Sequence, residues 1–308
     1  MQRFTALARL RDVAAQDVLP LAQRVMRRAR QGVDDARLRV LGGDFEERVR
    51  FLRARYRDRG GDPFGLDPEA AKYAVMVCAF FHRLYFRTEV HGIENVPAGR
   101  VLVVANHSGQ LPIDAAIIGT SLFLDAQPPR VTRAMVEKWT QTLPFVSTFY
   151  NRVGQVVGVP ENCLRLLEMD ELILAFPEGS RGVCKPFSQR YQLEEFGSGF
   201  MRLALQSGAP IVPVAVIGAE EQYVNLGNLR WAARALGMPA FPVIPQLAIP
   251  GGQLPLPTKY RLYFGEPLRF AANPEDDDAS LERKVWVVRQ TVQAMINQGL
   301  TEREGVFF

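Results

Sequence analysis

From residue 89 onward, short apolar runs alternate with longer segments of helical periodicity, and this alternation limits the possible folds more than any other feature. The run at 101–105 is apolar at every position, as expected for a strand that is covered on both faces. Other strands are expected at 131–136, 155–159, 171–176, 211–217 and 260–265. Helices are expected at 114–124, 138–152, 161–170, 199–207, 228–236 and 280–297. This order predicts an α/β domain in which a layered, mixed sheet is covered by helices.

The first 59 residues are rich in arginine. They hold fifteen Arg and no Lys against eight acidic residues, a net charge of +7 in a chain whose total is +4. Segments 17–30 and 45–59 place apolar side chains at helical spacing, and Gly60, Gly61 and Pro63 then end the region. Such a basic helical segment is either a solvated surface or a contact for anionic lipid or nucleic acid. No nucleic-acid-binding motif occurs, so no nucleic acid partner is expected.

A further helix is expected at 68–86, and it is apolar nearly all round. Aromatic residues stand beside Arg83 and Arg87 at its end, so the helix is either buried in the core or lies in a membrane interface. We therefore divide the chain into an arginine-rich helical extension (1–88), with a candidate interfacial helix, and a domain at 89–308. No apolar run exceeds nine residues, whereas a spanning helix needs about 20, so attachment from the side is expected. The apolar, proline-rich segment 239–257 is a candidate second contact.

Chemistry is suggested first by His107, one of three histidines in the chain. It follows a strongly predicted strand, and the carboxyl end of a strand is where α/β folds bind ligands. Asp114 begins the next expected helix and could accept a hydrogen bond from one imidazole nitrogen, leaving the other to take a proton. The alternative is that Asp114 caps the helix and His107 is structural.

A second candidate element follows the strand at 171–176. There Glu178, Ser180 and Arg181 are presented on a turn flanked by glycine, and turn amides with an arginine suit a phosphate group. The alternative is an ordinary polar turn in which Gly179 supplies a positive φ. The three cysteines form no pair or cluster, so neither a disulfide framework nor a metal site is expected, and a reducing compartment is favoured.

The order Asn106-His107 … Asp114, then Phe176-Pro-Glu-Gly-Ser-Arg181, resembles the glycerolipid acyltransferases of the lysophosphatidic acid acyltransferase type. The arginine-bearing block of that family has a counterpart at Arg152 and its V-P-V element at 212–214, and the resemblance covers about residues 89–270. Three departures stand out. The spacing is H-x6-D rather than H-x4-D, Ser180 replaces a threonine, and 196–199 lacks the lysine of a Phe-Lys-x-Gly element, although an insert before it carries Lys185 and Arg190.

The resemblance implies a fold like that of glycerol-3-phosphate acyltransferase and transfer of a fatty acyl chain from acyl-CoA or acyl carrier protein to a hydroxyl of a glycerolipid such as lysophosphatidate. His107 and Asp114 would act as a general-base dyad. The residues implied to bind the acceptor are Arg152, Glu178, Gly179, Ser180 and Arg181. No cofactor besides the acyl donor is expected, and the protein is expected to be cytoplasmic and peripheral on the inner face of the cell membrane, in contact with anionic lipid. The alternative is a catalytically inactive, membrane-associated lipid-binding protein on the same fold, a reading that the longer His–Asp loop favours.

Overall fold

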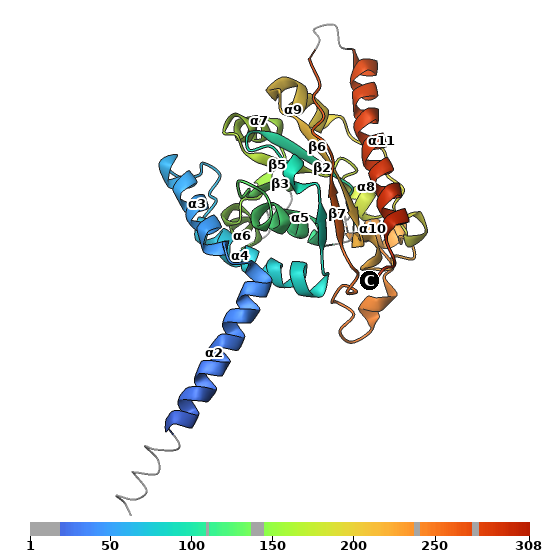
Figure 1. Ribbon diagram of the computed structural model, residues 1–308. Helices are drawn as coiled ribbons and strands as arrows, with labels where there is room; N and C mark the ends of the chain where they lie inside the picture. Colours follow the sequence, from blue (N-terminus) through green and yellow to red (C-terminus); the bar gives the residue numbers. More distant parts are fainter. Residues whose placement is uncertain (1–18, 109–110, 137–144, 237–240, 273–276) are drawn as a thin grey trace, which may run out of the picture. The chain divides into compact units, whose positions relative to one another are not determined.

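The computed structural model describes residues 19–108, 111–136, 145–236, 241–272 and 277–308 (Figure 1). By internal contacts the chain divides into two units, Met1–Phe45 and Glu46–Phe308. In the first unit the described part is largely the helix α2 (Leu19–Leu41), which is longer than the 17–30 segment expected. The second unit contains the sheet. It also includes residues 46–88, which the sequence assigned to a separate extension. Phe86, for example, is fully buried in the same core cluster as strands of the sheet.

The described residues form one seven-stranded sheet in the order β1-β7-β6-β2-β5-β3-β4. All pairs are parallel except β6 with β7, so the mixed sheet expected from the sequence is confirmed. The strands are β1 (Glu89–His91), β2 (Val101–Ala105), β3 (Thr132–Val136), β4 (Val156–Val157), β5 (Leu172–Ala175), β6 (Ile211–Ile217) and β7 (Arg261–Phe264). Because β2, β5, β3 and β6 run in one direction, their carboxyl ends share one edge of the sheet.

Helices cover both faces of the sheet, as Figure 1 shows for α5 on one side and α11 on the other. Leu102 and Val104 of β2 point into the cluster formed with α7, α9 and α11, while Val101 and Val103 point into the cluster formed with α5. All four side chains are fully buried, which is why the strand has no polar position. The helices of this unit are α3 (Phe45–Asp58), α4 (Pro68–Phe80), α5 (Ile113–Leu124), α6 (Val146–Arg152), α7 (Pro160–Glu168), α8 (Ser180–Val183), α9 (Gly199–Ser207), α10 (Arg230–Leu236) and α11 (Asp278–Glu302).

Three segments differ from the sequence-based expectation. The helix expected at 68–86 is α-helical only to Phe80 and continues as the π-turn η2 (Phe81–Tyr85), closed by a hydrogen bond from Phe86 N to Phe81 O. His82 and Phe86 are buried, so not all of this segment can face a membrane. The helix expected at 138–152 begins at Val146, and 137–144 lies outside the described residues. The described part of the proline-rich segment holds one 3-10 turn, η7 (Pro245–Ala248).

Among the helices of the described ranges, none is both long enough and apolar enough to cross a bilayer.

Candidate active site

The loop after β2 is fixed at its first residue. Asn106 is fully buried, and its side-chain amide exchanges two hydrogen bonds with Val216 of β6. Its Nδ2 donates to the carbonyl oxygen of Val216 at 2.9 Å, and its Oδ1 accepts from the Val216 amide at 2.7 Å. The side chain thereby continues the ladder between β2 and β6 by one step and sets the direction in which the chain leaves the sheet.

His107 and Asp114 meet, despite the two additional residues between them. His107 Nδ1 lies 2.7 Å from Asp114 Oδ2, which also accepts a hydrogen bond from the Ser108 amide at 2.9 Å. Asp114 is fully buried in the first turn of α5, and the imidazole stacks on Phe176 with ring centroids 4.1 Å apart. The His107 side chain keeps 16 % of its surface exposed. The dyad geometry is therefore present, with Nε2 left for another partner; residues 109–110 of the loop lie outside the described part.

Glu178 has a different position from the one expected. It is buried, its Oε1 accepts from the His107 backbone amide at 3.1 Å, and its Oε2 accepts from the Glu194 amide at 2.9 Å. Both oxygens are thus occupied by the protein itself. Gly182 leaves room for this, since a Cβ there would lie 2.8 Å from Glu178 Cβ. Glu178 thus holds the backbone that carries His107, and its expected role in binding the acceptor stays a prediction.

Two charged residues at the site were not singled out from the sequence. Lys185 is buried, with Nζ 3.2 Å from Glu178 Oε2 and 3.3 Å from Glu220 Oε1. In the sequence Lys185 stands out only as part of an insert before residues 196–199. Glu220 stands three residues beyond the end of β6, so the rule that selected His107, a polar residue just after the carboxyl end of a buried strand, would have selected it too.

The remaining predicted residues make no hydrogen bond or ion pair with His107 or Asp114 among the interactions of the described residues. Gly179 does adopt the left-handed conformation, with φ +58°, and its amide donates to Phe176 O at 3.0 Å. Arg181 is 54 % exposed and donates to the carbonyl of Glu195. Arg152 is paired with Asp67, the N-cap of α4, at 2.5 Å, and none of its contacts among the described residues reaches the His107 loop. The side chain of Ser180 is outside the described part of the chain.

The electrostatics favour a charged form of the histidine. Burial of the ring lowers the pKa of His107, but the charge and hydrogen bond of Asp114, helped by Glu178, outweigh it and hold the pKa above its usual value. A carboxylate placed in this way fixes the proton on Nδ1 and stabilises the imidazolium. At Glu220 burial dominates and raises the pKa to about 7, against the opposing charge of Lys185.

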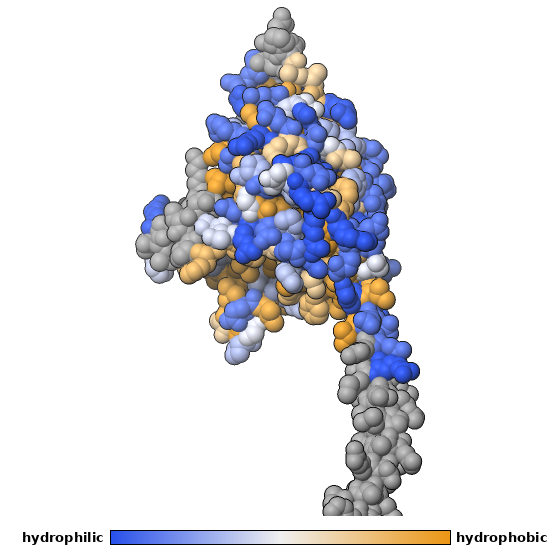
Figure 2. Space-filling view, turned by 90° about the vertical axis from the view of Figure 1, so that its left-hand side faces the viewer, coloured by the Kyte–Doolittle hydropathy of each residue, from blue (hydrophilic) through white to orange (hydrophobic). Residues whose placement is uncertain are grey.

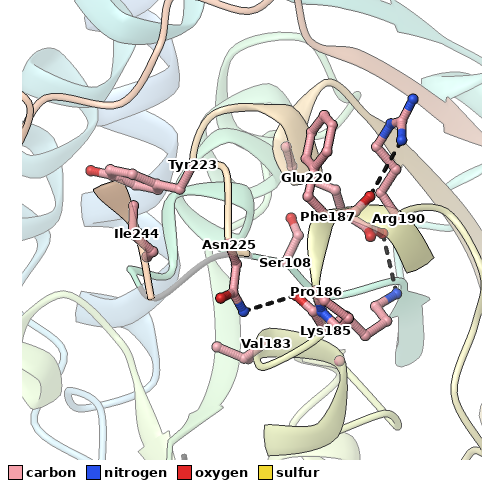
Figure 3. A pocket seen from close by; sticks show the side chains of 12 residues that line it. Ser108, Val183, Lys185, Pro186, Phe187, Arg190, Glu220, Tyr223, Asn225 and Ile244 are labelled. Carbon is pink, nitrogen blue, oxygen red and sulfur yellow. Dashed lines mark hydrogen bonds and ion pairs between the residues drawn. The ribbon is translucent and has the colours of Figure 1, made fainter. Parts of the chain in front are cut away.

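A pocket opens beside the dyad (Figure 3). Its wall includes Ser108, the residue after His107, together with Lys185, Arg190 and Glu220. Its apolar lining comes from Val183, Phe187, Tyr223 and Ile244. Within the described ranges no group of His, Cys, Asp and Glu could hold a metal ion. The site therefore joins a proton acceptor to an adjacent, partly apolar pocket.

Comparison with known proteins places this site in a family. The profile described as Acyltransferase matches residues 87–217, which includes the dyad and Glu178. A protein of Mycobacterium leprae that is named only as uncharacterized is 39 % identical over 84 % of this chain and 73 % of its own length. The chain belongs to the glycerolipid acyltransferase family.

More distant relatives agree with this assignment. A mouse protein named "DGAT1/2-independent enzyme synthesizing storage lipids" is 25 % identical over 68 % of this chain and 60 % of its own length. The crystal structure of the 1-acyl-sn-glycerophosphate acyltransferase PlsC from Thermotoga maritima superposes with a TM-score of 0.51, covering 88 % of this chain and 93 % of that one at 20 % identity. The protein is an O-acyltransferase with the PlsC-like fold.

Proposed function

We propose that the protein transfers a fatty acyl chain from a thioester, acyl-CoA or acyl carrier protein, to a hydroxyl group of a glycerolipid. The observation that carries this proposal is the hydrogen bond of 2.7 Å between His107 Nδ1 and the buried carboxylate of Asp114. It leaves Nε2 as the basic atom of a largely buried imidazole beside a pocket. The name of the mouse relative, which refers to storage lipids, agrees with a glycerolipid product.

In the proposed reaction His107 Nε2 accepts the proton of the acceptor hydroxyl as its oxygen attacks the thioester carbonyl. Asp114 accepts the hydrogen bond from Nδ1 and stabilises the imidazolium that forms. The tetrahedral intermediate then expels the thiolate, which takes the proton back from Nε2. One C–O bond forms, one C–S bond breaks, and His107 returns to its neutral form. No acyl-enzyme is required, because a thioester is already activated and both substrates are held together.

The test is release of free thiol from acyl-CoA in the presence of a glycerolipid acceptor, with the esterified product identified by mass spectrometry. We expect acceptor-dependent thiol release by the wild type. The rival reading, a lipid-binding protein without catalysis, predicts binding to lipid but no thiol release with any donor or acceptor.

We propose further that the protein lies on a membrane from the side. Tyr73, Val77, Phe80 and Leu84 follow one another at helical spacing along α4 and η2, and each is between 48 and 63 % exposed. This α4 stripe ends beside Arg83, which is paired with Asp125, and Arg87, which donates to the carbonyl of Pro257, so charged groups border the apolar stripe as they do at a membrane interface. Figure 2 shows apolar atoms gathered along the lower part of the molecular surface, below a more polar upper part.

The proline-rich segment extends the same surface. Tyr85 donates to the carbonyl of Pro255 at 2.6 Å and Arg87 to that of Pro257 at 2.7 Å, so η2 and this segment lie together. Four large apolar side chains in the described part of the segment are exposed: Leu247, Ile249, Leu254 and Leu256. The arginine-rich residues 1–59 would add attraction to anionic lipid. The three free cysteines agree with a reducing compartment, the cytoplasmic side of the cell membrane.

Flotation with anionic vesicles tests the membrane proposal. We expect the wild type to float, more weakly at high salt, and the double variant Phe80→Asp, Leu84→Asp to stay in the soluble fraction. The matched control is Trp286→Asp with Val287→Asp, two exposed apolar residues of α11 on the other face of the sheet. Equal flotation of both double variants and the wild type would contradict the assignment of the α4 stripe.

A further inference from the structure

Two atoms of the described pocket lining have no hydrogen bond, Ser108 Oγ and Arg190 Nε. The Arg190 side chain is 38 % exposed, so only Ser108 presents a fully buried polar group without a partner. Ser108 is 98 % buried (2 % exposed), and its Oγ has no hydrogen-bond partner among the described residues. In Figure 3 it lies at the centre of the side chains that line the pocket. A buried hydroxyl without a partner is costly, so its presence here points to a partner supplied by a ligand. Ser108 directly follows His107, which places that ligand at the reacting group.

The charges of the pocket wall are balanced within the protein. The Lys185 ammonium lies between Glu178 and Glu220 and donates to the carbonyl of Gln192, so its three N–H bonds are all directed at protein oxygens. Arg190 lies over the Phe187 ring, with Nε 3.8 Å from Glu221 Oε1. Each cation of the wall thus has a carboxylate within 4 Å, and the Glu221 carboxylate beside Arg190 is also bonded to Arg303 through both its oxygens.

The arginines that the sequence assigned to a phosphate are also engaged elsewhere. Arg152 is paired with Asp67, and Arg181 is hydrogen-bonded to the carbonyl of Glu195 with the Glu195 carboxylate 3.7 Å away. A phosphate monoester carries nearly two negative charges at neutral pH and would need cations that are free to face it. Because these arginines are already paired, we expect them to bind a phosphate group only weakly.

We infer that the pocket takes the uncharged glycerol part of the acceptor, with Ser108 Oγ hydrogen-bonded to a glycerol hydroxyl or ester oxygen, so that the acceptor is a mono- or diacylglycerol rather than a lysophosphatidate. This inference rests on the proposed acyl transfer. Phe187, Tyr223 and Ile244 supply the apolar wall for the glycerol carbons. Ser108 fixes the acceptor so that its reacting hydroxyl lies near His107, and it takes no proton itself.

The wild-type test compares monoolein, diolein and oleoyl lysophosphatidate in otherwise identical vesicles, with thiol release from oleoyl-CoA as the readout. We expect kcat/KM for one of the neutral acceptors to exceed that for lysophosphatidate at least tenfold. A preference for lysophosphatidate would overturn the inference and leave the proposed acyl transfer standing. No thiol release with any of the three would instead overturn the proposed acyl transfer.

Two variants test the pocket itself. Ser108→Ala should raise KM for the neutral acceptor about tenfold and change kcat little, because one hydrogen bond to bound acceptor is lost. Ser198→Ala, a serine at the start of α9 that does not line the pocket, is the matched control and should leave KM unchanged. Glu220→Gln should shift the preference ratio toward lysophosphatidate severalfold, because Lys185 then has one carboxylate fewer beside it. An unchanged KM in Ser108→Ala, with an unchanged melting temperature, would overturn the role of Ser108.

Discussion

Two networks of buried charge lie at opposite edges of the same parallel strands. The carboxyl-edge network, beyond the ends of β2, β5 and β6, consists of His107, Asp114, Glu178, Lys185 and Glu220. The amino-edge network, at the starts of β3 and β5, consists of Asp62, Arg133, Glu171 and Tyr56. Both are embedded in the protein, yet we assign a reaction to one and only stability to the other. Their partners explain why.

The amino-edge network is closed. Arg133 is fully buried and is paired with Asp62 and, through Nε at 3.5 Å, with Glu171; its guanidinium also lies over the Tyr56 ring. Arg59 adds a further hydrogen bond of 2.8 Å to Glu171 from the rim. The network joins α3 and the loop before α4 to the sheet, and its central cation is fully enclosed.

The carboxyl-edge network is open. The His107 ring keeps part of its surface exposed, its Nε2 is not used by the dyad, and Ser108 Oγ is unpartnered beside a pocket. Burial of charge and shifted pKa values occur at both edges, so neither is a sign of function by itself. Arg133 Nε of the amino-edge network also has no hydrogen bond, so an unpaired atom is not the difference either. The exposed histidine and the pocket beside it are what distinguish the two.

The largest expected difference between the two edges is a loss of turnover when the carboxyl-edge network is altered. His107→Ala should lower kcat for acyl transfer by about 10²–10⁴-fold, because it removes the proposed general base. Its thermal unfolding should stay close to that of the wild type, since His107 stands on the loop after β2 and belongs to neither core cluster. Near wild-type thiol release by the purified variant would contradict the mechanism.

At the amino edge we expect the opposite result, a loss of stability without a loss of activity. Arg133→Met should lower the free energy of unfolding by about 3–5 kcal/mol, because it leaves the carboxylate of Asp62 buried without its cation, whereas Glu171 keeps Arg59. The rate per folded molecule should be unchanged. Urea unfolding, with Arg57→Met as the exposed control, measures the first, and the rate of thiol release divided by the folded fraction measures the second. Loss of activity in fully folded Arg133→Met would show that the amino edge also serves the reaction.

A smaller change sharpens the description of the carboxyl edge. In the wild type, kcat/KM should fall as the pH drops through the raised pKa of His107, so the acid limb should lie above pH 6.5. Asp114→Asn removes the carboxylate that raises this pKa, while burial still lowers it, so the limb should move to lower pH. The plateau should fall roughly ten- to hundredfold with the lost charge-assisted hydrogen bond. An acid limb that does not move would separate Asp114 from the titration of His107.

The comparison also shows which features the sequence could reveal. The strands β2, β5 and β6 were predictable because each is a continuous apolar run, and His107 followed from its place after one of them. β1 was missed because three residues, of which one is exposed, carry no apolar pattern. The pairs Arg133–Asp62 and Arg152–Asp67 join residues 71 and 85 positions apart, and nothing local in the sequence specifies such contacts.

The smallest expected effects concern the two arginines that the sequence assigned to the acceptor. Arg152→Ala and Arg181→Ala should each change the acceptor KM by less than about threefold, because their guanidinium groups are paired with Asp67 and Glu195 on the surface. Arg152→Ala should cost at most about 1 kcal/mol of stability, as for other exposed ion pairs. Saturation curves with monoolein and lysophosphatidate decide the matter. A rise of tenfold or more in KM for lysophosphatidate alone would show that the altered arginine binds the phosphate of the acceptor. The carboxyl edge would then contain an anion-binding site.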